Sequence, residues 1–196
     1  MKLTATIVTG LLLCFAGAAR ADKSSPRTPS RSSMLGSAEH QVYFGADADF
    51  AMPVGNYSDI NGVGGGLLLT AEYPVLEQLS ATARVGFQFH LDKGVLGADA
   101  HVHSIPVLLG AKYYLLETNR QGLFAAAELG MFDLMTGVSA GGSSASQNDI
   151  KFGAGAGIGY SYEKWNARVN IHTHDVGHFG DAIMVTGGIG YQFAGL

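Results

Sequence analysis

LSATARVGFQFHL, residues 79–91, alternates apolar side chains with small or polar ones over its whole length. The apolar positions are every second residue from Leu79 to Leu91, and the positions between them include Arg84 and His90. Side chains that alternate with period two point to opposite faces of a β-strand. The stretch therefore predicts a long strand with one apolar face and one polar face.

Seven other segments show the same alternation, which gives eight predicted strands in all. The predicted strands are residues 40–51, 63–73, 79–91, 103–115, 123–134, 150–162, 167–174 and 182–193. The connections between them are alternately long and short. The long ones are 53–62, 92–101, 136–149 and 175–181, and the short ones are 74–78, 117–121 and 163–166. Tight turns at one end and longer loops at the other are typical of even-stranded membrane barrels. We therefore predict an all-β fold, an eight-stranded antiparallel up-and-down transmembrane β-barrel.

The polar face of the predicted strands carries charged residues and many of the glycines. In a lipid-embedded barrel this face lies inside, where glycine leaves room for long side chains in a narrow lumen. Lys112 and Glu128 lie at similar distances from the short turns on adjacent strands, so we expect them to form an ionic pair. Glu72 lies closer to its turn than Arg84 does, but the long Arg84 side chain could partly bridge this offset, so we expect a second pair between them. The expected lumen ionic network is Asp47, Asp49, Glu72, Arg84, Lys112, Glu128 and Arg168. A soluble barrel with these charges outside is the alternative.

The N-terminal residues have the features of a secretory leader. Lys2 precedes an apolar run from Ile7 to Ala19, and Ala19-Arg20-Ala21 has small residues at the positions that a signal peptidase requires. Cys14, the single cysteine, lies inside this leader, so the mature chain would contain no disulfide. We predict a signal peptide at 1–21, a flexible periplasmic linker rich in Ser and Pro at 22–37, and an outer-membrane β-barrel at 38–196.

Composition narrows the possible functions. Only 14% of the residues are charged, and the formal net charge is −4, which argues against nucleic acid as a partner. No run of 18 apolar residues follows the leader, so the sequence does not predict a transmembrane helix.

The last predicted strand contains TGGIGYQF, residues 186–193. Its Thr186, Gly188, Tyr191 and Phe193 resemble the C-terminal signal that the outer-membrane barrel assembly machinery reads. The stretches SIPVLLGAKYY, residues 104–114, and GADADF, residues 45–50, are similar to the fourth and first strands of the outer-membrane barrel families that include the OmpA transmembrane domain and the OmpX-like proteins. This resemblance implies an outer-membrane location, with both termini in the periplasm. It also implies outer-membrane lipids, the assembly machinery and periplasmic chaperones as partners.

Histidines gather near the end of the predicted barrel that has the long loops. His101, His103, His172 and His174 are weak candidates for metal ligands, because imidazole binds zinc, copper and nickel, but no spacing matches a closed metal site. The stretch His172-Thr173-His174-Asp175 resembles the His-x-Ser pair of lipid A deacylases, but it has no serine at that spacing, and Thr173 is expected to face lipid. We therefore predict no catalytic site and no cofactor.

The sequence favours a structural or surface-interaction role with a lumen filled by side chains, because eight strands enclose space for little else. A narrow porin-like channel for small solutes is the first alternative, and a lipid A-modifying enzyme is the second.

Overall fold

The barrel strands follow one another around the sheet in chain order. The computed structural model describes residues 41–95, 98–115, 120–141 and 143–196, so the expected signal peptide and linker lie outside the described residues. The elements are β1 (Tyr43–Pro53), α2 (Tyr57–Ile60), β2 (Gly64–Pro74), β3 (Leu79–His90), β4 (Lys93–Val95), β5 (Ala98–Tyr114), β6 (Gly122–Ala140), β7 (Ser143–Tyr162), β8 (Trp165–Thr173), the 3-10 helix η1 (Val176–Asp181) and β9 (Ile183–Gly195).

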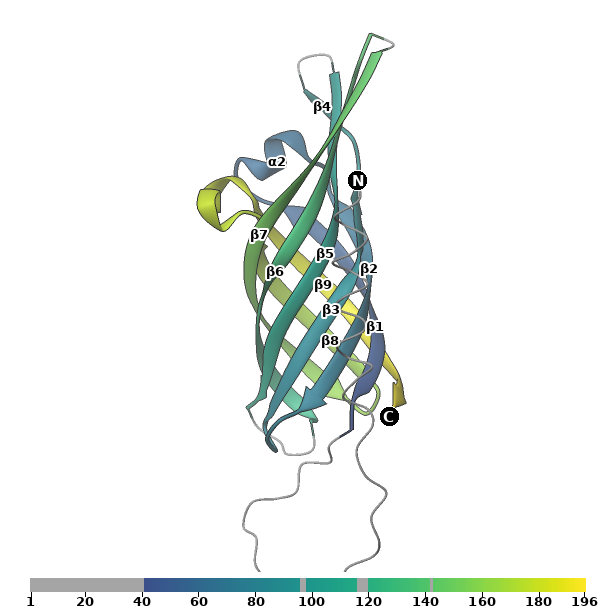
Figure 1. Cartoon of the computed structure of the whole chain (residues 1–196), viewed down its shortest axis with the longest axis vertical. Helices are drawn as coiled ribbons and strands as arrows, with labels where there is room; N and C mark the ends of the chain where they lie inside the picture. Colours follow the sequence, from purple (N-terminus) through teal and green to yellow (C-terminus); the bar gives the residue numbers. More distant parts are fainter. Residues whose placement is uncertain (1–40, 96–97, 116–119, 142) are drawn as a thin grey trace, which may run out of the picture. The chain divides into compact units, whose positions relative to one another are not determined.

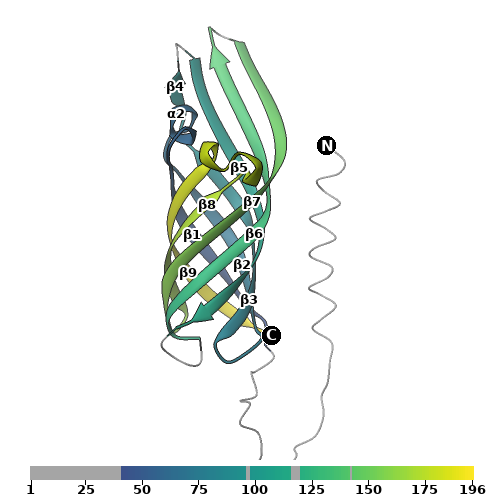
Figure 2. The same ribbon diagram turned by 90° about the vertical axis from the view of Figure 1, so that its left-hand side faces the viewer.

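Eight strands close into the barrel, and β4 is a short additional strand beside β5. Neighbours pair antiparallel, from β1 with β2 around to β8 with β9. The ring closes where β1 pairs with β9, Asp47 standing opposite Gly190, and where β3 pairs with β5. Figures 1 and 2 show the strands tilted around a common axis. The prediction of an eight-stranded antiparallel up-and-down barrel is confirmed.

The two ends of the barrel differ. The start of β1 pairs with the end of β9, so both lie at the end that carries the short turns. The helices α2 and η1, the strand β4 and the tip of the β6–β7 hairpin lie at the opposite end (Figure 1). We call the first end the short-turn end and the second the long-loop end.

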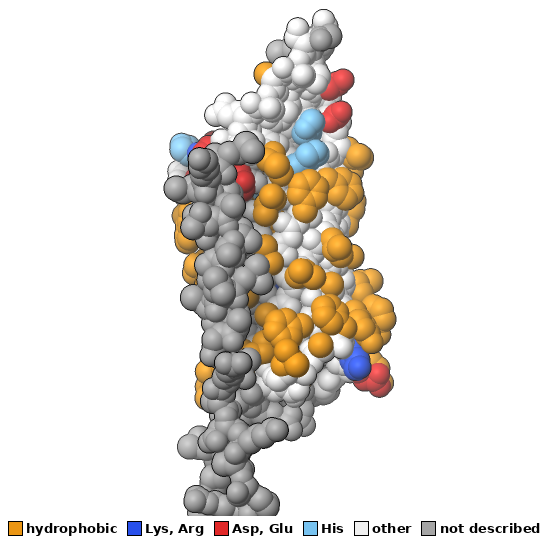
Figure 3. Space-filling view, turned by 45° about the vertical axis from the view of Figure 1, so that its right-hand side comes forward, with side chains coloured by type: hydrophobic (Ala, Val, Ile, Leu, Met, Phe, Trp, Pro, Cys, Tyr) orange, Lys and Arg blue, Asp and Glu red, His pale blue; other side chains and the backbone are white. Residues whose placement is uncertain are grey.

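The strands place apolar side chains outward and polar side chains inward. Leu67, Ile158 and Ile189 are each at least 60% exposed, whereas Arg84 is 4% exposed. Figure 3 shows hydrophobic side chains over the wall of the barrel, with charged residues and histidines toward its ends. So large an apolar surface is expected to contact lipid rather than water. The soluble-barrel alternative is therefore wrong.

All four of the predicted long loops contain regular structure. The segment 136–149 was expected as the longest loop, but β6 and β7 continue their pairing through it to Ala140 opposite Ser143. Backbone hydrogen bonds maintain this ladder without apolar alternation, which is why the sequence pattern missed it. The strand β4 forms within 92–101, α2 forms within 53–62, and η1 forms within 175–181. Among the described residues, no helix is long and apolar enough to span a membrane.

Candidate functional site

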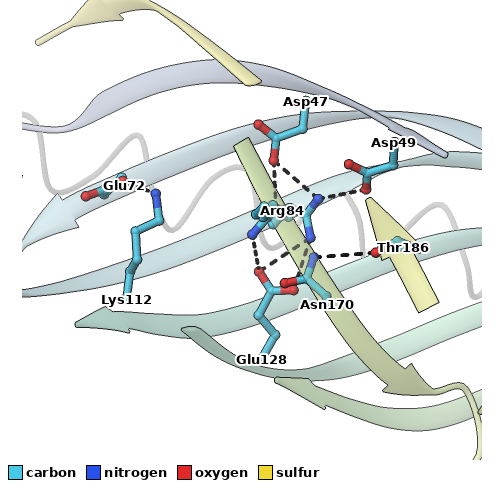
Figure 4. Close-up of polar contacts among 9 residues, drawn as sticks. Asp47, Asp49, Glu72, Arg84, Lys112, Glu128, Asn170 and Thr186 are labelled. Atoms are coloured by element: carbon cyan, nitrogen blue, oxygen red, sulfur yellow. Dashed lines mark hydrogen bonds and ion pairs between the residues drawn. The ribbon is translucent and has the colours of Figure 1, made fainter. Parts of the chain in front are cut away.

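Two arginines and three carboxylates meet inside the barrel, and we call these five residues the ionic cluster: Asp47, Asp49, Arg84, Glu128 and Arg168. Nη2 of Arg84, on β3, lies 3.0 Å from Asp49 Oδ2 and 3.2 Å from Asp47 Oδ2, and its Nη1 lies 3.1 Å from Glu128 Oε2. Nη2 of Arg168, on β8, lies 2.6 Å from Asp47 Oδ2, and its Nη1 lies 3.1 Å from Glu128 Oε1. Figure 4 shows the Arg84 side chain among the carboxylates of Asp47, Asp49 and Glu128.

The ionic cluster is buried. None of its five side chains is more than 6% exposed. Removing a charge from water is costly unless opposite charges and hydrogen bonds replace the lost solvation. Each guanidinium here bridges carboxylates from two different strands, so the cluster ties opposite sides of the wall together.

A second ion pair lies in the lumen between Lys112 on β5 and Glu72 on β2. Lys112 Nζ lies 2.7 Å from Glu72 Oε2, and the Tyr114 hydroxyl donates a hydrogen bond of 2.9 Å to Glu72 Oε1. The ammonium group of Lys112 also lies 4.7 Å from the centre of the Phe124 ring, a distance at which cation and ring attract.

The structure pairs the predicted residues differently from the sequence analysis. Lys112 was expected beside Glu128, and Glu72 beside Arg84, but Lys112 contacts Glu72 and Arg84 contacts Glu128. The strand register explains the exchange, because Glu128 stands opposite Gly110, two residues from Lys112. Both pairs reach over an intervening strand. Pairing by depth on adjacent strands was therefore the wrong criterion in a tilted barrel.

Glycine on the inner face makes the space for these side chains. A Cβ atom added to Gly188 would lie 2.0 Å from Asp49 Oδ1, and one added to Gly190 would lie 2.0 Å from Asp47 Oδ1. A methyl group at either position would displace a carboxylate of the ionic cluster. Gly188 and Gly190 of the TGGIG run on β9 are thus part of the site. The sequence predicted that glycines lie on the inner face, but not that these two contact the carboxylates of the ionic cluster.

A polar pocket opens at the short-turn end and extends to the ionic cluster. Its lining includes Tyr43, Glu72, Lys112, Asn166 and Gln192, together with Asp47, Arg84 and Arg168 of the cluster. The cluster therefore marks the depth that this pocket reaches.

The predicted metal candidates separate into two groups. His101 and His103 are half-buried and stack with ring centres 4.4 Å apart, and His101 Nδ1 lies 2.7 Å from Oδ1 of the exposed Asp92. His172 and His174 are buried, with ring centres 6.0 Å apart. Among the described residues, no three His, Cys, Asp or Glu side chains are arranged to hold a metal ion.

Sequence reasoning placed His90 at the long-loop end with the other histidines, but it missed Met184 and Tyr57 beside them. His90 Nε2 lies 3.3 Å from Met184 Sδ. The Tyr57 ring of α2 makes edge contacts with the rings of His90 and His174, with distances between ring centres of 6.3 and 5.4 Å. Burial raises the pKa of Tyr57, so its hydroxyl stays protonated. The position of His90 at the end of the polar face of residues 79–91 was the signal that placed it there. Nothing local in the sequence placed Tyr57 there.

The remaining candidate residues lie near the end of β8 and on β9. Thr173 was expected to face lipid, but it is fully buried, and its Oγ1 donates a hydrogen bond to the Asp175 carbonyl. Thr186 faces inward and accepts a hydrogen bond from Asn170 Nδ2 at 3.4 Å. Tyr191 and Phe193 are exposed on the outer surface.

Comparisons with known proteins identify the fold. Neither the known family models nor the curated proteins match this sequence. Ail, the attachment invasion locus protein of Yersinia pestis, is similar in structure with a TM-score of 0.57 at 14% identity, over 80% of this chain and 100% of that one. The N-terminal β-barrel domain of Pseudomonas aeruginosa OprF is similar with a TM-score of 0.50 at 16% identity, over 79% of this chain and 98% of that one. At these identities the likeness concerns the fold alone, and this chain has the fold of the eight-stranded outer-membrane β-barrels.

Proposed function

We propose that this chain is an outer-membrane protein with a lumen filled by side chains and with a structural or surface-interaction role. The ionic cluster is the observation that carries the proposal. Its guanidinium groups link carboxylates from β1 and β6 across the interior, at side-chain exposures of 6% or less. An eight-stranded barrel has little interior space beyond its own side chains, and a cluster of ion pairs across that interior obstructs a solute.

The same proposal includes export to the outer membrane. Residues 1–21 act as the signal peptide, residues 22–37 as the periplasmic linker, and the short-turn end faces the periplasm, in agreement with the general orientation of such barrels. Periplasmic chaperones carry the unfolded chain, and the assembly machinery reads Thr186, Gly188, Tyr191 and Phe193. The position of β9 as the closing partner of β1 supports this reading.

The long-loop end supplies the surface for interaction. Residues 143–153 of β7 pair with β6, whereas the pairing of β7 with β8 begins only at Ala154. The β6–β7 hairpin therefore continues beyond the closed wall of the barrel, as Figures 1 and 2 show. The similar structure of Ail belongs to a protein named for attachment and invasion, which supports a surface role for this end.

Planar-bilayer conductance tests the filled lumen. Folded protein reconstituted in a bilayer is expected to give no stable open channel, because the ionic cluster crosses the interior. The narrow porin-like channel is the second candidate, favoured by the polar pocket that reaches the cluster from the short-turn end. Stable and well-resolved openings at moderate salt would support that channel and contradict the filled lumen.

Adhesion of cells tests the surface role. Cells that display the wild-type chain are expected to adhere to protein-coated surfaces better than cells displaying a variant in which residues 138–145 are replaced by Asn-Gly. A matched control is the double variant His101→Ala/His103→Ala, which changes the outer surface elsewhere at the same end. Equal adhesion of the wild type and the hairpin variant, at equal levels in the outer membrane, would contradict a role for the hairpin.

A further inference from the structure

The buried histidines at the long-loop end have no hydrogen-bond partners that account for their burial. Nε2 of His172 and both ring nitrogens of His174 are buried without a hydrogen-bond partner among the described residues. His174 is 0% exposed and His172 is 5% exposed. A buried polar atom that has lost its water and gained no partner is costly, so a native structure requires a reason for each one. A bound ligand supplies such a reason.

The chemistry around these imidazoles is that of a metal site with a thioether ligand. His90 Nε2 lies 3.3 Å from Met184 Sδ. Two ligands on one first-row metal, with bonds of about 2.0 Å to nitrogen and about 2.3 Å to sulfur in tetrahedral geometry, stand about 3.5 Å apart. The pair is therefore spaced as two ligands of one ion are, and in the metal-free protein the same contact serves as a weak N–H···S hydrogen bond.

His174 shares an aromatic neighbour with His90 of this pair. The Tyr57 ring makes edge contacts with both His90 and His174, and Phe132 stacks on His174 at 4.3 Å between ring centres. These aromatic neighbours hold the imidazole in place but give its nitrogens no hydrogen bond. A fixed ring whose unprotonated nitrogen has no partner is prepared for coordination.

We propose that His90, Met184 and His174 bind a copper ion inside the long-loop end of the barrel, beneath α2. The ligand types select the metal. Thioether sulfur favours Cu(I) over zinc, whereas imidazole accepts both, so the combination favours copper. Because no three His, Cys, Asp or Glu side chains of the described residues are arranged as a metal site, the thioether is an essential part of this one.

Copper titration of the purified, folded full-length chain in detergent tests the proposal. Cu(I), held reduced by ascorbate and buffered by a colorimetric chelator, is the probe, and the wild type is expected to bind one equivalent. Met184→Leu keeps the side-chain volume, and His174→Phe keeps a ring against Phe132. Each is expected to weaken binding by about tenfold or more, on the scale of losses seen when a metal site is perturbed. The control His101→Ala/His103→Ala removes two histidines from the outer surface and is expected to bind as the wild type does.

X-ray absorption of the copper-loaded wild type is expected to show a sulfur neighbour of the metal that disappears in Met184→Leu. Three outcomes would overturn the proposal: no uptake by folded wild-type protein, unchanged uptake by Met184→Leu, or loss of uptake in the His101→Ala/His103→Ala control, which would move the site to the outer surface. Binding of zinc with no binding of copper would also overturn it. If His174→Phe does not fold, Met184→Leu and the sulfur signal decide alone.

Discussion

At the residue scale, each arginine of the ionic cluster contacts carboxylates on two other strands. Arg84 reaches Asp47, Asp49 and Glu128, and Arg168 reaches Asp47 and Glu128. Because these groups are buried, removing one of them leaves opposite charges without compensation. The cluster therefore acts as a unit, and the cost of deleting a member exceeds the contribution of any single contact.

Arg84→Met is expected to lower the free energy of unfolding by about 3–5 kcal/mol, because it leaves Asp49 and Glu128 short of a counter-charge. Urea unfolding in detergent, followed by the fluorescence of Trp165, the single tryptophan, measures the change. Lys151→Met provides the control, since Lys151 forms partly exposed ion pairs with Asp149 and Asp175 and is expected to change stability little. Equal effects of the two substitutions would contradict a buried cluster.

The adjacent glycines Gly187 and Gly188 give a matched test of the space around the cluster. A Cβ on Gly188 would lie 2.0 Å from Asp49 Oδ1, whereas a Cβ on Gly187 meets no described atom within 4 Å. Gly188→Ala is expected to destabilise the barrel by about 1–3 kcal/mol through overpacking. Gly187→Ala is expected to be neutral or to stabilise it by about 0.4–1 kcal/mol, because it restricts the unfolded chain. The same urea titration compares them, and the reverse order would show that the Gly188 face does not point into the lumen.

At the scale of elements, alternation in the sequence predicted the strands wherever one face meets lipid. The predicted strand 79–91 corresponds to β3, Leu79–His90, because lipid on one side requires an apolar residue at every second position. The extended hairpin escaped prediction for the opposite reason. Its outer part stands beyond the closed wall, where neither face needs to be apolar. The two strands therefore pair regularly through their backbones although their side chains include Ser, Gly and Asn. The two helices of the long-loop end are too short to leave a periodic pattern.

The hairpin is expected to be independent of barrel folding. Replacing residues 138–145 with Asn-Gly preserves the pairing of Gly137 with Ser146 and closes it with a favoured two-residue turn. The variant is expected to unfold in urea at the same midpoint as the wild type, because the removed residues make none of the ion pairs of the lumen. A large fall in the midpoint would show that the hairpin supports the barrel wall.

At the scale of the whole molecule, the sequence predicted which face of the barrel wall points into the lumen, but not the contacts that side chains make across the lumen. Charges and glycines on one face, with apolar residues on the other, were enough to place Asp47, Arg84 and Arg168 inside. The partners of each charge depend on strand tilt and register, which bring Lys112 to Glu72 over an intervening strand. The gathering of His90, Met184 and Tyr57 likewise depends on closure, since these residues come from β3, β9 and α2.

The closed eight-stranded barrel and its place in the outer membrane can be tested together. The test is electrophoresis of protein extracted from outer membranes, with and without boiling in detergent. A closed barrel whose backbone hydrogen bonds are all between strands resists detergent until heated. The unheated protein is expected to migrate as a compact form, distinct from the boiled one. Absence of the protein from the outer-membrane fraction, or identical migration before and after boiling, would contradict the closed barrel in the outer membrane.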